Sequence, residues 1–415
     1  MHILILTQYY PPETGAPQNR LSDLARRLAR SGHDLTILTA MPNYPRGKIF
    51  EEYRNRFLVK DEHAGIKVVR TWIYATEKKT FVRRLLNYFS FVVSSFAFGI
   101  SKIGSPDIVI VESPPLFLGI SGFLLSLCKN AKLVLNVSDL WPDSAVAMGV
   151  LSNNVLIRAS RALEEFLYRR STLITGQTRG IVDNIQSRFP YKEVALITNG
   201  VDVAAFLNAS NSAQRAEIRR EFALEGKFVI GYAGLHGLAQ GLDTVIHAAR
   251  LLVDHQDVLF AFFGEGPEKE KLVQQVGQFG LKNVRFYSSQ PSARMPAVVG
   301  SFDVALIPLK RLELFKGALP SKMFEAMAAA VPLLASIEGE ARELVEKAQA
   351  GLCIEPENPN AMADVVLQFY RDPGSLQALG RNGQRYVIEH YDRQKIADQF
   401  ERLLTHGYRA EMASA

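Results

Sequence analysis

The residues with the clearest chemical potential are a serine, a lysine and a glutamate in the segment 320–328. If a helix begins near Pro320, Ser321 and Glu325 are four residues apart and Lys322 and Glu325 are three apart, so all three share one face near the amide-rich end. Such a face could bind a nucleoside diphosphate, with backbone amides and Lys322 on the phosphates and the Glu325 carboxylate on the ribose hydroxyls. A glutamate in a first turn also complements the helix dipole without any ligand, and this alternative stays open.

A glycine-rich segment, 231–241, offers a second place for phosphate. It follows a predicted strand and leads into a helix predicted over 242–253. Its glycines, including Gly234 and Gly237, allow the backbone to approach a phosphate closely. The spacing does not match G-x-G-x-x-G, and the chain contains no G-x-x-x-x-G-K-[ST]. Neither a strict dinucleotide fingerprint nor a nucleoside triphosphatase loop is therefore present.

A proline-rich loop, Tyr9–Pro17, follows the first predicted strand. It brings Gly15, with free backbone amides, to the N-terminus of a predicted helix, where an anion can bind. A turn stiffened by proline explains the same residues equally well.

The loop Asn136–Asp143 follows a later strand of the first half and carries Asp139 and Trp141. Asp139 would face a cleft between two domains, and Trp141 offers an apolar surface for a sugar ring or for the core. An aspartate before a helix is commonly a cap, so the role of Asp139 stays open.

Two series of short apolar strands alternate with helical stretches and position these loops. This pattern is typical of α/β proteins with parallel sheets and crossover helices, which bind ligands at the carboxyl ends of their strands. A polar segment, 202–226, separates the two series, and an amphipathic helix over 17–31 illustrates the connections. The predicted strands are 2–6, 35–38, 66–69, 108–111, 133–135, 173–175 and 194–197, followed by 228–232, 258–262, 284–287, 304–307 and 332–335.

The composition is that of a large globular protein. The 415 residues, 47% of them hydrophobic and 22% charged, favour two domains and exclude a disordered scaffold. A formal charge of +6 favours anionic partners, and we expect these not to be nucleic acid.

Cys128 and Cys353 lie far apart, so we expect reduced, buried thiols in the cytosol and neither a disulfide framework nor zinc. The first residues lack the basic region of a signal peptide, so we expect no export.

Two uncharged apolar stretches, within 81–100 and 115–128, raise the question of a membrane. Both are shorter than the roughly 20 apolar residues of a spanning helix. The first lies beside four cations, Lys78, Lys79, Arg83 and Arg84, and could lie on an anionic bilayer surface. A crossover helix that covers the sheet is the alternative.

Six motifs occur in an order that resembles the retaining glycosyltransferases of family 4. These have the GT-B architecture of two facing Rossmann-like domains, and the resemblance covers essentially the whole chain. The motifs are Tyr9–Glu13, Pro42–Pro45, Asp139–Pro142, Thr198–Asp202, Gly264–Pro267 and Pro320–Ala328.

Within this family the chain looks most like bacterial enzymes of O-antigen or capsule assembly that add a sugar such as N-acetylfucosamine to a lipid-linked acceptor. The resemblance implies a UDP-linked donor on the second domain, 202–391, and the acceptor on the first, 1–201. It also implies that a last helix, about 392–415 with its terminus, returns to the first domain. The enzyme would work in the cytoplasm, peripherally on the inner face of the membrane.

The predicted site needs no cofactor beyond the nucleotide-sugar substrate. No Asp-x-Asp triplet occurs in the chain, which agrees with a mechanism without metal. Lys322 and Gly237 would bind the phosphates, Glu325 the ribose and the Tyr287 backbone the base. The predicted donor residues are Gly15, Gly234, Gly237, Gln240, Glu265, Tyr287, Ser321, Lys322 and Glu325, and the predicted catalytic residues are Asp139, Lys322 and Glu325.

Several positions depart from the family pattern. Gly317 stands where many members have the first carboxylate of a Glu-x7-Glu pair, and Leu235 and Gln240 stand where many have an arginine and a lysine. Asp139 occupies the apparent position of a family histidine. A sugar-nucleotide epimerase and a non-catalytic nucleotide-sugar-binding protein therefore remain as alternative functions.

Overall fold

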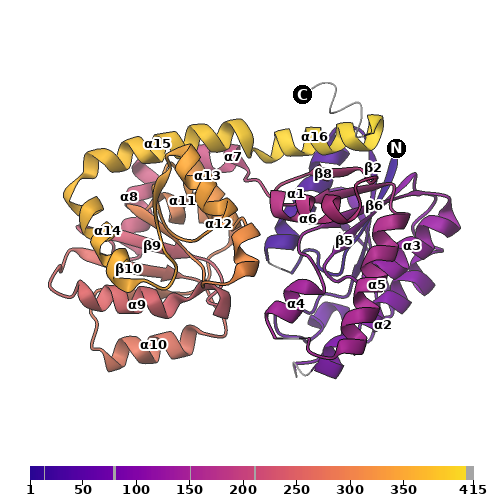
Figure 1. Cartoon of the computed structure of the whole chain (residues 1–415), viewed down its shortest axis with the longest axis horizontal. Helices are drawn as coiled ribbons and strands as arrows, with labels where there is room; N and C mark the ends of the chain where they lie inside the picture. The colour runs from indigo at the N-terminus through magenta and orange to yellow at the C-terminus, as the bar shows by residue number, and fades with distance from the viewer. Residues whose placement is uncertain (14, 78–80, 150, 210–211, 408–415) are drawn as a thin grey trace. The chain divides into compact units, whose positions relative to one another are not determined.

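The computed structural model describes residues 1–13, 15–77, 81–149, 151–209 and 212–407. The chain forms two compact units, each built on one sheet with helices packed against it (Figure 1). The first unit contains Met1–Thr198 and the chain from Ile396 onward, and the second contains Asn199–Lys395. The sequence placed the two divisions after residues 201 and 391.

The first unit has an eight-stranded sheet in the order β3-β4-β2-β1-β5-β6-β7-β8. Its strands are β1 (His2–Leu6), β2 (Asp34–Ala40), β3 (Leu58–His63), β4 (Ile66–Thr71), β5 (Ile108–Ser113), β6 (Lys132–Val137), β7 (Leu173–Gly176) and β8 (Val194–Leu196). Its helices are α1 (Ala16–Arg30), α2 (Phe81–Gly99), α3 (Leu118–Lys129), α4 (Asp143–Ala147), α5 (Asn154–Arg170), α6 (Arg179–Arg188) and most of α16 (Arg393–His406), with a 3-10 turn at Glu51–Tyr53.

The second unit has a six-stranded sheet in the order β11-β10-β9-β12-β13-β14. Its strands are β9 (Phe228–Ala233), β10 (Val258–Phe263), β11 (Val284–Tyr287), β12 (Val304–Pro308), β13 (Leu333–Ser336) and β14 (Gly351–Ile354). Its helices are α7 (Val203–Ala209), α8 (Ser212–Glu221), α9 (Leu242–Leu251), α10 (Lys269–Gln278), α11 (Met295–Gly300), α12 (Ser321–Ala328), α13 (Glu340–Ala348), α14 (Pro359–Arg371) and α15 (Pro373–His390), with 3-10 turns at Leu238–Gln240, Ser292–Arg294 and Glu313–Gly317.

The two-sheet α/β fold expected from the sequence is confirmed, and each predicted strand is present. The sheets are parallel except for β3, which pairs antiparallel with β4 and is not among the predicted strands. β3 carries Lys60, Asp61 and Glu62, so it lacks the continuous apolar run by which a buried strand is found. These polar residues are tolerated because β3 is an edge strand of the sheet.

The helix predicted over 17–31 is α1, and its apolar face is the reason it forms. Leu21 and Ala25 are fully buried, and Leu28 nearly so. Gly32, with φ of 90°, follows its end, as expected for a residue beyond a helix C-terminus.

The expectation of two buried thiols is wrong for Cys128. This residue is exposed on α3, and Cys353 is half-buried on β14. The buried positions of α3 end at Ser126, and Cys128 lies beyond them in the last turn of the helix, which ends at Lys129. Burial raises the pKa of the Cys353 thiol to about 11, so that thiol stays protonated.

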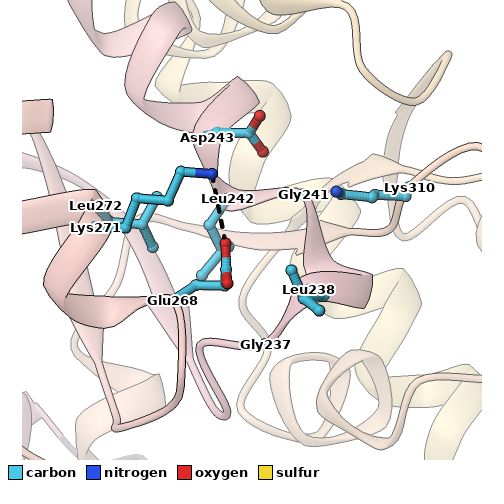
Figure 2. Close-up of a pocket in the computed structure, with 9 residues that line it drawn as sticks. All are labelled: Gly237, Leu238, Gly241, Leu242, Asp243, Glu268, Lys271, Leu272 and Lys310. Atoms are coloured by element: carbon cyan, nitrogen blue, oxygen red, sulfur yellow. Dashed lines mark ion pairs between the residues drawn. The ribbon is translucent and has the colours of Figure 1, made fainter.

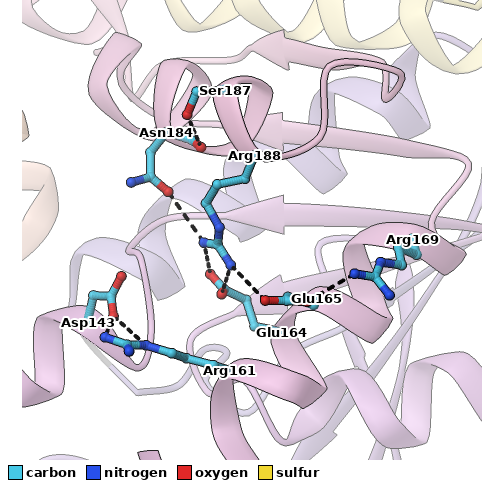
Figure 3. Close-up of polar contacts among 8 residues, drawn as sticks. All are labelled: Asp143, Arg161, Glu164, Glu165, Arg169, Asn184, Ser187 and Arg188. Carbon is cyan, nitrogen blue, oxygen red and sulfur yellow. Dashed lines mark hydrogen bonds and ion pairs between the residues drawn. The ribbon is translucent and has the colours of Figure 1, made fainter. Parts of the chain in front are cut away.

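A set of ion pairs fastens the helices that follow β6 and β7 (Figure 3). Arg188 of α6 donates from both terminal nitrogens to Glu164 of α5, over 2.7 and 3.2 Å. Glu164 is only 2% exposed, so this bidentate pair compensates an otherwise costly buried charge. Arg161 of α5 contacts Asp143 of α4 at 3.0 Å. The short helix that follows the Asp139 loop is thereby held to α5.

Two negative findings bear on the predicted partners. None of the helices within the described residues has the length and apolarity needed to cross a bilayer. In the same part of the chain, no group of three or more His, Cys, Asp or Glu side chains is arranged to hold a metal ion.

Candidate functional site

Three segments meet at the carboxyl edge of the second sheet, where open parallel sheets bind ligands. The first segment follows β9 and begins at Gly234, and the second follows β10 and begins at Gly264. The third is the first turn of α12, which begins at Ser321 after β12. The residues predicted at 234–241, 265 and 321–325 thus lie on neighbouring elements.

Lys322 is the central side chain of this edge. Its Nζ donates to the Tyr232 hydroxyl at 2.7 Å, lies 4.1 Å from that ring's centroid, and approaches Gly234 so closely that a Cβ there would be 3.2 Å away. The Tyr232 hydroxyl donates in turn to the Leu235 carbonyl at 2.6 Å. The ammonium is therefore held against the glycine loop by a fully buried tyrosine.

The electrostatics of Lys322 favour an anionic ligand. Burial lowers the pKa of Lys322 to about 8, and the negative charge of Glu325 partly opposes this shift. Burial also raises the pKa of Glu325, opposed by the positive charges of Arg393 and Lys322. A diphosphate beside Lys322 would supply the opposite charge that the ammonium lacks.

No side chain caps the first turn of α12, whose N-cap is Pro320. The Met323 N–H donates to the Pro320 carbonyl at 3.1 Å, so the N–H groups of Ser321 and Lys322 are the ones without a partner within the helix. Met323 and Phe324 are fully buried and fix the helix. Ser321, Lys322 and Glu325 are only partly buried. Helix α12 thus has the predicted face, which carries Ser321, Lys322 and Glu325, and its opposite face packs into the core.

Glycines allow close backbone contact between the segments that follow β9 and β10. A Cβ at Gly264 would lie 1.9 Å from the Gly234 carbonyl oxygen, and one at Gly266 would lie 2.3 Å from the His236 carbonyl oxygen. Gly234 and Gly264 also have φ values of 147° and 146°, which disfavour other residues. Only glycine fits these two strand ends.

Gln240 stabilises the loop rather than projecting from it. Its Oε1 accepts the Gly237 N–H at 3.2 Å, and Gly237 accepts the Gln240 N–H at 3.4 Å. This closed turn also lines a small cavity of about 60 Å³, together with Asp243, Lys271 and Lys310 (Figure 2). The cavity is far below the roughly 300 Å³ of a small-molecule site, so a nucleotide does not fit in it.

Lys269, absent from the predicted site, occupies the edge beside β11. Its ammonium donates to the Gly264 carbonyl at 2.9 Å, to Glu265 Oε1 at 2.8 Å and to the Tyr287 carbonyl at 3.2 Å. The Tyr287 carbonyl also accepts the Gly264 N–H. The Tyr287 backbone, predicted to contact the base, is therefore already engaged by the loop.

His236 was also missed, although it lies within the glycine segment. It is fully buried among the rings of Tyr232, Phe262 and Phe286, and neither ring nitrogen has a hydrogen-bond partner among the described residues. Burial, reinforced by the charge of Lys269, lowers the His236 pKa to about 4, so the imidazole is neutral at pH 7. The sequence marked His236 as a site residue only through its position between Gly234 and Gly237.

In the first unit, Asp139 lies two residues beyond β6 and is partly exposed. Burial raises the pKa of its carboxyl, while the Ser144 hydroxyl and the Leu140 backbone N–H oppose the rise. Trp141 packs against Phe117, with 5.2 Å between ring centroids, so this tryptophan joins an aromatic cluster at the edge of the core.

A buried polar network beneath this loop escaped the sequence analysis. Glu112, 3% exposed at the end of β5, accepts from Arg20 and Ser138 through Oε1, and from Asn136 at 2.6 Å through Oε2. Gln177 donates to the Ser138 hydroxyl at 2.6 Å. The network fixes the backbone just before Asp139.

Gly15 belongs to the first unit, whereas the other predicted donor residues belong to the second. A Cβ at Gly15 would lie 2.4 Å from the Gln18 Oε1 atom, so the glutamine oxygen already covers the start of α1. Gly15 thus serves close packing of Gln18 in this structure.

The two units, each a largely parallel sheet with helices packed against it, define the GT-B class of two Rossmann-like domains. Sucrose-phosphate synthase from Thermosynechococcus elongatus has the same fold, with a TM-score of 0.75 over 100% of both chains at 17% identity. Anabaena Alr3699/HepE in complex with UDP-glucose gives a TM-score of 0.72 over 98% of this chain and 100% of that chain, at 16% identity.

The family comparisons divide the chain in the same way. Residues 15–200 match the glycosyl transferase 4-like domain, and residues 214–386 match the glycosyl transferases group 1. The chain is therefore a glycosyltransferase with a 4-like domain followed by a group 1 domain. It is 27% identical over 409 residues to the putative colanic acid biosynthesis glycosyl transferase WcaI of Escherichia coli K12, covering 96% of this chain and 98% of the relative.

Proposed function

We propose that the enzyme transfers a sugar, with retention of anomeric configuration, from a UDP-linked donor to a lipid-linked glycan acceptor in bacterial surface polysaccharide biosynthesis. The sugar we propose is an N-acetylated deoxyhexosamine such as N-acetylfucosamine. The observation that carries the proposal is the Lys322 ammonium held beside Gly234 at the carboxyl edge of the second sheet. The UDP-glucose in Alr3699/HepE and the colanic acid role described for WcaI support the choice of donor and process.

The proposed mechanism stabilises two charges that develop as the glycosidic bond breaks. Lys322, the amides of α12 and the glycine loop offset the negative charge of the departing diphosphate. Glu325 accepts hydrogen bonds from the ribose and positions the donor. Asp139 stabilises the positive charge at the anomeric carbon or orients the acceptor hydroxyl. We propose that no metal takes part, because cationic side chains and amides serve the leaving group.

Donor recognition can be tested by thermal unfolding with UDP, GDP and ADP sugars. A UDP sugar is expected to raise Tm by several degrees, because a ligand that binds only the folded state stabilises it by mass action. Glu325→Ala is expected to weaken the binding of that ligand about 10- to 100-fold, the value of one hydrogen bond to a charged group.

Glu343→Ala is the matched control, because Glu343 is exposed on α13. It should leave the Tm shift unchanged. Equal donor affinity in Glu325→Ala and the native enzyme would remove Glu325 from the donor site.

We also propose that α2 contacts the anionic inner face of the cytoplasmic membrane. Its side chains Val82, Leu86, Phe89 and Val93 recur at helical spacing and are 64%, 52%, 40% and 66% exposed. Arg83 and Arg84 in the same first turns complement anionic headgroups. Lys78 and Lys79, the other two predicted cations, lie outside the described residues.

Replacing Leu86 and Val93 with serine should reduce co-sedimentation with phosphatidylglycerol vesicles at least tenfold. Each buried aliphatic side chain contributes about 1.5–3 kcal/mol to such burial. Leu251→Ser with Val253→Ser removes two comparably exposed apolar side chains, 53% and 47% exposed, from the second unit. If both double variants sediment like the native enzyme, α2 does not bind the membrane.

A further inference from the structure

A cavity of about 580 Å³ opens in the first unit beyond the carboxyl end of β4, and none of the predicted site residues lines it. Its walls are the loop 47–54, the segment 72–77 that follows β4, and Arg83 in the first turn of α2. The volume lies within the roughly 300–1,000 Å³ of small-molecule sites. The cavity also lies at the sheet edge where parallel strands present ligands.

The walls of this cavity are fastened to one another. A Cβ at Gly47, which has φ of 71°, would lie 2.1 Å from the Thr76 carbonyl oxygen, so the two segments touch through their backbones. The Tyr74 N–H donates to Ser90 Oγ at 2.8 Å, and the Tyr74 carbonyl accepts from Asn87 Nδ2 at 2.8 Å. These bonds tie the cavity to α2.

The charges around the cavity favour an anion. Lys48, Arg54 and Arg83 line it, against one carboxylate, Glu77. Lys48 Nζ lies 3.0 Å from Glu77 Oε1, but both side chains are 59% exposed. Such a surface pair contributes at most about 1 kcal/mol, so a multiply charged ligand can displace Glu77.

Within the described part of the chain, Arg54 and Arg83 make long contacts, and the Arg54 Nε also donates to the Ile49 carbonyl at 3.3 Å, which leaves the terminal nitrogens for a ligand. Arg54 Nη1 is 3.4 Å from Glu51 Oε1, and Arg83 Nη1 is 3.4 Å from Thr76 Oγ1. Both guanidinium groups can therefore turn toward a ligand in the cavity. Guanidinium binds phosphate oxygens in a bidentate manner, which suits a ligand with more than one phosphate.

The cavity is apolar as well as basic. Trp72 and Ile49 line it, and Val82, the first residue of the exposed apolar face of α2, directly precedes Arg83. The basic side chains therefore lie in the cavity, and the apolar face of α2 begins beside it. This arrangement suits a ligand with a charged head and a hydrocarbon tail.

We infer that this cavity binds the diphosphate head of a lipid diphosphate acceptor, whose hydrocarbon lies along Val82, Leu86, Phe89 and Val93. The inference rests on the proposed function, because it assigns the acceptor's head to a site in the first unit. Lys48, Arg54 and Arg83 hold the phosphates. Trp72 packs against the part of the ligand's hydrocarbon that lies next to the diphosphate.

Trp72 supplies a direct optical probe. The chain has two tryptophans, so Trp141→Phe leaves Trp72 as the only one. Farnesyl diphosphate, a soluble lipid diphosphate, is expected to change Trp72 emission in this background. Lys48→Glu with Arg54→Glu should weaken that binding at least tenfold, because two charge-assisted contacts become repulsive.

Arg46→Glu with Arg56→Glu is the matched control. Both arginines are exposed in the same region, outside the cavity lining, and the change in net charge is identical. The control should stay within twofold of the native affinity, and inorganic diphosphate should compete with farnesyl diphosphate. Equal weakening by the two double variants would overturn the inference. Farnesol binding as tightly as farnesyl diphosphate would also overturn it, as would phosphatidylglycerol vesicles alone producing the Trp72 change.

UDP binding, measured on the same proteins, separates the two proposals. If UDP binds the native enzyme and the Lys48→Glu/Arg54→Glu variant equally while farnesyl diphosphate binds neither, the acceptor site is wrong and the donor site stands. If UDP fails to bind the native enzyme, the proposed function falls, whatever farnesyl diphosphate does.

Discussion

Lys322→Met is expected to reduce kcat/KM for the nucleotide-sugar donor about 10²- to 10³-fold. One preorganised donor to a developing oxyanion in a partly desolvated site contributes this much. Methionine preserves the unbranched apolar stem and removes the ammonium, so the contacts of α12 with the core should persist. The loss of kcat/KM would therefore reflect the missing charge of Lys322 and not a change of fold. Steady-state kinetics with varied donor concentration measures it.

The pH dependence of donor affinity supplies an independent readout of the same residue. With a pKa of about 8 in the free enzyme, Lys322 is largely protonated at pH 7 and loses its charge above pH 8. Because a diphosphate binds the ammonium and not the neutral amine, the apparent Kd for UDP should rise up to about tenfold per pH unit above pH 8. Lys322→Met should show no such rise.

Lys271→Met is the control for both measurements, because Lys271 is 73% exposed on α10. It should retain native kinetics and the native pH dependence. A Lys322→Met enzyme with native kcat/KM, or with the native pH dependence of UDP affinity, would show that another group binds the diphosphate.

Asp139→Asn is expected to lower kcat about 10²- to 10⁴-fold with little change in the Kd for UDP. A carboxylate that moves a proton or stabilises charge at the reacting centre contributes this much, and it does so mainly in the transition state. The proposed donor-binding residues other than Gly15 lie in the second unit, so ground-state donor affinity should not depend on Asp139. Initial rates with saturating donor, together with UDP titration, distinguish the two effects.

Asp143→Asn is the matched control for Asp139. Asp143 lies four residues on, at the start of α4, and pairs with Arg161 on the surface. Its loss should cost at most about 1 kcal/mol of stability and leave kcat unchanged. If Asp139→Asn keeps native kcat, or if it loses donor affinity as much as rate, Asp139 has no part in the chemical step.

The architecture could be predicted because strands buried on both faces form continuous apolar runs. Such runs led to each strand of the parallel arrangement except β14, whose four residues Gly351–Ile354 are also apolar but were not predicted as a strand. β3 was missed for a different reason: Lys60, Asp61 and Glu62 interrupt its apolar run, and Lys60 and Glu62 are exposed at the edge of the first sheet. Edge strands need not be apolar, so their pairing is decided by the neighbouring strand.

The shared face of Ser321, Lys322 and Glu325 was also predictable, because helical geometry alone brings residues three and four apart together. The partner of Lys322 was not. Tyr232 lies 90 residues earlier in the chain, and its hydroxyl meets the ammonium only because β9 and α12 converge at one sheet edge. The lowered pKa of Lys322 follows from that burial.

The same limit applies to the groups that sequence reasoning missed. Lys269 binds the carbonyls of Gly264 and Tyr287, and Glu112 collects Arg20, Asn136 and Ser138 from three different elements. No local pattern marks these contacts, since Tyr287 lies 18 residues after Lys269 and the partners of Glu112 lie at least 24 residues from it.

By itself, then, the sequence determined the alternation of strands and helices, the glycines at strand ends and the spacing along α12, because these follow from local periodicity and backbone conformation. Only the tertiary structure decided which charges lie buried beside which loops, and that a basic cavity opens beyond β4. Burial and proximity between distant segments set those properties, and they exist only once the sheets have formed.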